Sequence, residues 1–187
     1  VYKNIKNAIL FLLSGNMAGI LAVLYTSLAA LPVPFQPVHL LFINLLTDSL
    51  PALAIGMEPA ERDVLSEKPR NPKGGILERR FMALLLGQGA LIAVCTMISF
   101  EVGLKESAAL ASTMAFATLT LARLFHGFNC RSRHSIVKIG FRRNWYSLGA
   151  FALGVLLLAL VLFVPALKPL FEVETMNGMQ LGCVGVM

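Results

Sequence analysis

Five long apolar runs constrain this chain more than any other feature of its sequence. They cover residues 8–31, 39–57, 81–100, 107–128 and 144–167. A helix needs about 20 apolar residues to cross a bilayer core. Asp48 and Arg123 are the only Asp, Glu, Lys or Arg residues within the runs. We therefore expect an all-α fold, a polytopic membrane helix bundle with five complete transmembrane helices.

A sixth apolar run opens at Met179 and stops with the chain at Met187. Ten residues of helix or fewer rise about 15 Å, roughly half of a bilayer core. The chain also starts at Val1 rather than at an initiator methionine, and no signal-peptide pattern precedes the first run. We interpret residues 1–187 as one transmembrane domain of a longer protein.

The composition supports a membrane location and excludes several other classes. Apolar residues make up 57% of the chain and charged residues only 14%, whereas a soluble domain carries about 25% charged residues. This excludes a disordered chain and a conventional nucleic-acid module. The three cysteines (Cys95, Cys130 and Cys183) are widely spaced and odd in number, which indicates neither a disulfide framework nor a CxxC metal site.

The basic residues predict the orientation of the bundle. If the runs alternate in direction, Lys105 and Lys168 fall on one side, Arg123 lies within a run, and the other 13 of the 16 Lys and Arg residues fall on the opposite side. The positive-inside rule makes that opposite side cytoplasmic. The chain start and the loops 58–80 and 129–143 are then cytoplasmic in a multi-pass protein of the cell membrane. The first of these loops is either a solvated linker or a docking surface for a cytoplasmic domain.

Oxygen-bearing side chains gather in the second run, where polar groups are costly. A charge at the centre of a span costs about 2.5 to 3.5 kcal/mol and by default marks function. Asn44, Thr47 and Asp48 are three or four residues apart, so we expect them to share one helical face. Pro51 lacks an amide hydrogen and leaves the Thr47 carbonyl without its usual helical donor. The spacing predicts a helix that breaks beside a cation, although a buried polar network without an ion is the alternative.

The oxygen count favours half of a site for a hard cation. Asn16 adds an amide oxygen from the first run, unless it serves only an interhelical hydrogen bond. Ca²⁺ takes six to eight oxygens, and these four residues supply at most about six, including the Thr47 carbonyl. A single carboxylate leaves bound Ca²⁺ with a net positive charge. We therefore expect a further acidic ligand from outside this chain.

Three segments of the chain resemble a known family of membrane pumps. The stretch LLFINLLTDSLPALAIGMEP (40–59) resembles the sixth transmembrane helix of P-type Ca²⁺-ATPases of the sarcoplasmic-reticulum and bacterial type. VYKNIKNAILFLLSGN (1–16) is similar to their fifth helix, and STMAFATLTLARLFHGFN (112–129) to their eighth. The likeness covers essentially the whole chain in order, from the fifth helix to the start of the tenth, and NLLTDSLPA is its specific motif.

The resemblance implies a ligand set and two departures from it. Asn44, Thr47 and Asp48 match the sixth-helix Ca²⁺ ligands of the family, and Asn16 matches its fifth-helix Asn ligand. Two Glu ligands of the two-site pumps are replaced, by Gly19 and by Arg123. The chain thus resembles the single-Ca²⁺ members, which implies one transported Ca²⁺ per cycle.

Arg123 has two interpretations. Its side chain either extends toward the cytoplasmic interface, or its guanidinium fills the space of the lost ion and pairs with Asp48 when the site is empty. The second interpretation predicts that Arg123→Glu changes the ion stoichiometry or the pH dependence of the complete pump.

The resemblance also implies chemistry that this chain lacks. The family forms an aspartyl-phosphate, with Mg²⁺ and ATP bound by cytoplasmic domains inserted before the fifth helix. The sequence has no DKTG-like phosphorylation motif, no nucleotide loop and no PEGL element. We expect the full-length protein to be a Ca²⁺-transporting ATPase, and this chain alone not to hydrolyse ATP. Its expected partners are the bilayer and the missing N-terminal helices and cytoplasmic domains.

Other polar residues have simpler interpretations. His39 and His126 lie near the ends of runs and are expected at the interface, and Trp145 and Tyr146 form an interfacial belt. Cys130 and His134 are two ligands without partners, a poor zinc site. The basic loop that follows Cys130 is expected to contact anionic lipid rather than nucleic acid.

Two rival functions remain open at this stage. A P-type pump for Na⁺, H⁺ or Mn²⁺ would use the same carboxylate with neutral oxygens. An ATP-independent transporter or a passive membrane scaffold would share only the intramembrane Asp48. A phosphorylation motif upstream of this chain would separate the second rival from a pump.

Overall fold

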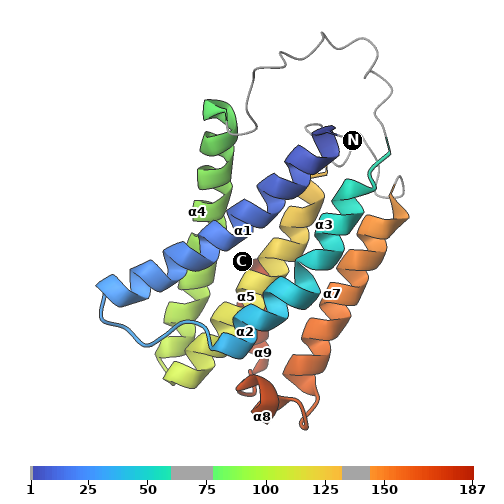
Figure 1. The fold of residues 1–187 in the computed structure, drawn as a ribbon. Helices are drawn as coiled ribbons and strands as arrows, with labels where there is room; N and C mark the ends of the chain where they lie inside the picture. The colour runs from blue at the N-terminus through green and yellow to red at the C-terminus, as the bar shows by residue number, and fades with distance from the viewer. Residues whose placement is uncertain (1, 60–77, 132–143) are drawn as a thin grey trace.

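Every regular element in the described part of the chain is helical (Figure 1). The structure, a computed structural model, describes residues 2–59, 78–131 and 144–187. The helices are α1 (Tyr2–Leu28), α2 (Pro37–Phe42), the π-helix η1 (Ile43–Thr47), α3 (Ser49–Gly56), α4 (Arg79–Leu104), α5 (Ala108–Asn129), α7 (Trp145–Phe163), α8 (Lys168–Phe171) and α9 (Gly178–Val186). The prediction of an all-α fold is confirmed.

The five predicted transmembrane helices are present, with shifted ends. Within the described residues, α1, α4, α5, α7 and the continuous segment Pro37–Gly56 are long and apolar enough to span a bilayer. The sixth run forms α9, which is too short to span one. The chain is therefore a multi-pass membrane protein. Most of the loop 58–80, the basic loop that follows Arg131, and His134 lie outside the described residues.

Helix α5 is the central helix of the bundle. It packs against α4, α1, α7 and α9 (Figure 1). Small side chains permit this close packing: Ala111, Ala115 and Ala117 are fully buried, and a Cβ on Gly103 of α4 would lie 2.7 Å from the Cα of Ala111. Most side chains of α5 are thus held in the interior of the bundle, although Phe125 is exposed. This placement decides the environment of Arg123.

The expectation that His39 lies at an interface is wrong. Its side chain is completely buried, stacked on the Phe116 ring with 4.4 Å between centroids. Its Nε2 lies 2.7 Å from the carbonyl oxygen of Phe171, and its Nδ1 accepts a hydrogen bond from the backbone N–H of Gln36. His39 therefore ties the start of α2 to α5 and α8. Trp145 and Tyr146, in contrast, are exposed at the start of α7.

Candidate functional site

The backbone of the second span is irregular next to Asp48, as predicted. The N–H of Asp48 donates to the carbonyl of Ile43, five residues back, at 2.8 Å. The Thr47 hydroxyl donates to the same carbonyl at 2.9 Å. Because Pro51 has no N–H, the helical bond to the Thr47 carbonyl cannot form. The irregularity takes the form of a π-helical turn, a feature that is frequent at functional sites, rather than an unwound segment.

The three polar residues of the second span differ in burial. Thr47 and Asp48 are buried, but Asn44 is exposed on the surface of the described chain. We expected all three on one face from the spacing of a regular α-helix. The structure places only Thr47 and Asp48 together in the interior of the described bundle, and Asn44 lies on its surface.

Asp48 and Arg123 form an ion pair inside the bundle. Each residue is only 2% exposed. The Nη2 of Arg123 donates to Oδ2 of Asp48 and also to Oδ1 of Asn16, the latter at 3.0 Å. The guanidinium therefore joins α5 to α1 and to the turn before α3. Arg123 does not extend toward the interface, and it makes the contact with Asp48 that the alternative interpretation predicted.

This ion pair leaves two buried polar atoms unsatisfied. Oδ1 of Asp48 and Nε of Arg123 have no hydrogen-bond partner among the described residues. A buried polar atom without a partner costs about 1 to 3 kcal/mol, and more when the group is charged. The free carboxylate oxygen can accept a donor or coordinate a cation, and the pair is therefore not a saturated structural salt bridge.

Gly15 of α1 borders the guanidinium of Arg123, whereas Gly19 does not. A Cβ on Gly15 would lie 2.6 Å from Nε of Arg123. The guanidinium can therefore occupy this position only because residue 15 has no side chain. The sequence alone suggests only close helix packing for Gly15. A Cβ on Gly19 would meet nothing within 4 Å. No side chain of the described residues therefore fills the position at which the resemblance implies a Glu in the two-site pumps.

His126 is buried next to this site, which corrects its expected interfacial position. Its Nε2 lies 2.7 Å from the Ser14 hydroxyl and 3.3 Å from the Cys130 sulfur. The hydrogen bond between His126 and Ser14 joins α5 to α1. Because the two residues are far apart in the sequence, no local pattern predicts it. Burial raises the pKa of Cys130 to about 12 and keeps the thiol neutral.

Asp48 stands apart from other potential metal ligands. Across residues 2–59, 78–131 and 144–187, no group of three His, Cys, Asp or Glu side chains is arranged to hold a metal ion. Ca²⁺ sites are built from several oxygens and usually more than one carboxylate. Asp48 therefore does not belong to a three-residue cluster of this kind among these residues.

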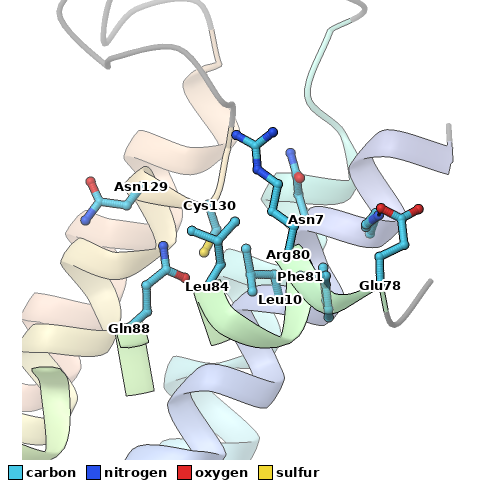
Figure 2. A pocket seen from close by; sticks show the side chains of 10 residues that line it. Asn7, Leu10, Glu78, Arg80, Phe81, Leu84, Gln88, Asn129 and Cys130 are labelled. Carbon is cyan, nitrogen blue, oxygen red and sulfur yellow. Dashed lines mark ion pairs between the residues drawn. The ribbon is translucent and has the colours of Figure 1, made fainter. Parts of the chain in front are cut away.

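A separate cavity of about 280 Å³ lies where α1, α4 and α5 meet near the basic end of the bundle, the end at which α1 begins. Figure 2 shows side chains of all three helices around it, including Asn7, Arg80 and Asn129. None of Asn16, Asn44, Thr47 and Asp48 lines this cavity. It is therefore distinct from the candidate ion site.

Comparison with known proteins decides the family. The family model described as cation transporting ATPase, C-terminus, matches residues 32–187. The chain belongs to this family. The matched region is the C-terminal membrane part of a P-type pump. The resemblance found in the sequence is therefore confirmed.

Relatives of this family member are named calcium-transporting ATPases. The chain is 41% identical over 175 residues to the calcium-transporting ATPase of Bacillus subtilis (strain 168), covering 92% of this chain and 20% of the relative. It is 37% identical over 181 residues to calcium-transporting ATPase lmo0841 of Listeria monocytogenes, covering 96% and 20%. It is 29% identical over 185 residues to human calcium-transporting ATPase type 2C member 2, covering 97% and 20%. The chain thus spans about a fifth of the length of these relatives.

Proposed function

We propose that this chain is the ion-binding transmembrane domain of an ATP-driven Ca²⁺ export pump, with Asp48 as its carboxylate ligand. One observation carries the proposal: a buried carboxylate beside a π-helical turn uses one oxygen to bind Arg123 and leaves the other without a partner. Most buried polar side-chain atoms in proteins have a hydrogen-bond partner, so an unpaired carboxylate oxygen supports a ligand role for Asp48. Replacing the guanidinium by a cation with several oxygen ligands satisfies both.

The remaining ligands follow from the residues around Asp48. The Thr47 hydroxyl oxygen is buried next to it and keeps a lone pair, because the hydroxyl only donates in its bond to Ile43. The amide oxygen of Asn16 already faces the same guanidinium. Asn44 is exposed, and we assign it to the face that receives the rest of the pump, together with the acidic ligand that this chain lacks.

The geometry around Arg123 supports one transported Ca²⁺ per cycle. Its permanent positive charge lies within hydrogen-bond distance of Asn16, and Gly19 supplies no carboxylate on the same helix. A second divalent cation at that position would meet a like charge instead of the two Glu ligands of the two-site pumps. We infer that Arg123 takes the place of one Ca²⁺ and serves as the counter-charge of Asp48 when the remaining site is empty.

We propose Ca²⁺ as the transported ion because the relatives are named for calcium transport. Family membership favours an ATP-driven pump over an ATP-independent transporter or scaffold. Na⁺, H⁺ and Mn²⁺ remain the alternative ions for the same oxygens. We propose that ATP and Mg²⁺ bind to cytoplasmic domains outside residues 1–187, and that the basic end of the bundle faces the cytoplasm.

The Asp48→Asn variant of the full-length protein tests the proposal. The substitution keeps the shape of the side chain and removes the charge that balances the ion. Wild-type protein should bind one Ca²⁺ per molecule and form the phosphoenzyme from ATP only when Ca²⁺ is present. The variant should lose both properties but retain phosphorylation by inorganic phosphate. Equilibrium binding of radioactive Ca²⁺ and phosphoenzyme assays measure these quantities.

Ser49→Ala is the matched control. Ser49 is the next residue, is exposed, and donates its hydroxyl to the Asn44 carbonyl, so its loss should leave Ca²⁺ binding near the wild-type value. Near-normal Ca²⁺ affinity in Asp48→Asn would refute the ligand assignment. Phosphorylation that responds to Na⁺ or Mn²⁺ but not to Ca²⁺ would refute the ion.

A further inference from the structure

A second buried ion pair lies at the basic end of the bundle. Nε of Arg131 donates to Oε2 of Glu58 at 2.8 Å, and Nη2 donates to Oε1 at 3.1 Å. Both side chains are almost completely buried. Two parallel hydrogen bonds make this a bidentate pair, the strongest arrangement of a guanidinium and a carboxylate. In contrast to Asp48, both carboxylate oxygens of Glu58 are satisfied.

Asparagine side chains tie this pair to two further helices. Nδ2 of Asn144, at the start of α7, donates to Oε2 of Glu58 at 2.7 Å and to the Ala54 carbonyl at 2.9 Å. From α1, Asn4 donates to the Glu58 carbonyl at 2.7 Å and Asn7 donates to the Arg131 carbonyl at 3.0 Å. We call Glu58, Arg131 and Asn144 the clamp. It joins the ends of α3 and α5 to α7 and α1.

The clamp and the candidate ion site connect the same two segments of chain. Asp48 and Glu58 flank α3 at its two ends, ten residues apart, whereas Arg123 and Arg131 are eight residues apart on and just after α5. These separations correspond to about 15 Å and about 12 Å of helix. Two ion pairs thus hold α3 against α5, of which only the inner pair has an unsatisfied carboxylate oxygen. The inner pair is therefore the one that can exchange its partner.

We propose that Glu58, Arg131 and Asn144 are positioning residues that hold α3 on α5 while Asp48 exchanges Arg123 for the transported cation. This inference rests on the proposed function. Because the clamp fixes the end of α3 near Glu58, only η1 and the turn at Asp48 move when Asp48 exchanges its partner. The Asp48 carboxylate then stays close to the other ligands of the ion. Preorganisation of this kind contributes to affinity without any contact with the ligand.

The Glu58→Gln variant of the full-length protein tests this role. The amide keeps the size of the side chain but leaves Arg131 without its counter-charge. We expect the Ca²⁺ concentration for half-maximal phosphorylation by ATP to rise about tenfold, a typical coupling between two sites. Phosphorylation by inorganic phosphate should stay near the wild-type level, because it does not require Ca²⁺. The double variant Glu58→Arg with Arg131→Glu should recover most of the lost affinity.

Glu78→Gln provides the matched control. Glu78 is exposed and forms a 3.5 Å ion pair with Lys6 at the same end of the bundle, so its loss should leave the Ca²⁺ dependence unchanged. If Glu58→Gln fails to fold, Asn144→Ser removes the amide that donates to Glu58 but keeps a side-chain oxygen for the Ser147 N–H at the start of α7, and it should shift the Ca²⁺ dependence about fivefold.

Three outcomes overturn the inference. An unchanged Ca²⁺ dependence in folded clamp variants, or an equal loss of phosphorylation by ATP and by inorganic phosphate, overturns it and leaves the proposed function standing. Wild-type protein that forms no Ca²⁺-dependent phosphoenzyme overturns the proposed function and the clamp's role together. The tenfold shift with recovery in the double variant supports the inference.

Discussion

Gly15 lies against the guanidinium of Arg123, and its lack of a side chain permits the ion pair with Asp48. In Gly15→Ala the new Cβ would stand 2.6 Å from Nε of Arg123 and displace the guanidinium. We expect the Ca²⁺-free protein to lose about 1 to 3 kcal/mol of stability, the usual cost of overpacking, and the apparent affinity for Ca²⁺ to rise because Arg123 competes less for Asp48. Thermal unfolding and Ca²⁺ titration measure the two effects. Gly149→Ala, where a Cβ meets nothing within 4 Å, is the control, and identical behaviour of the two variants would contradict this role for Gly15.

The second span combines two short α-helices with a π-helical turn, and Pro51 maintains the irregularity. In Pro51→Ala the restored N–H can bond to the Thr47 carbonyl and draw η1 toward a regular α-helix. The helix should gain up to about 3 kcal/mol of local stability, but Asp48 should turn away from Arg123 and Ca²⁺ affinity should fall at least about tenfold. The Ca²⁺ dependence of phosphorylation is the measurement. Pro37→Ala is the control, because Pro37 begins α2 and interrupts no helical bond; equal effects of both substitutions would exclude a role for the π-helical turn.

Across the whole molecule, the features that depend on local sequence were predictable and those that depend on distant contacts were not. The five spans follow from the length of the apolar runs, and Asp48 and Arg123 stand out because charge is rare in a span. His39 pairs with Phe171, 132 residues away, and no pattern near either residue indicates this contact. Glu58 and Arg131 lie outside the apolar runs, where hydropathy suggests only solvated loops, yet packing of four helix ends buries them. Asn44 is exposed although its neighbours Thr47 and Asp48 are buried, and its residue type does not reveal this difference.

The central claim is that Asp48 exchanges Arg123 for a transported Ca²⁺, and structures of the full-length protein with Ca²⁺ and with a chelator test it most directly. With the chelator, Arg123 should contact Asp48 and Asn16 as it does here. With Ca²⁺, an ion should lie about 2.3 to 2.6 Å from the Asp48 carboxylate, with the guanidinium withdrawn from it. An intact Asp48–Arg123 pair in a Ca²⁺-loaded structure, with the ion bound elsewhere, would contradict the account.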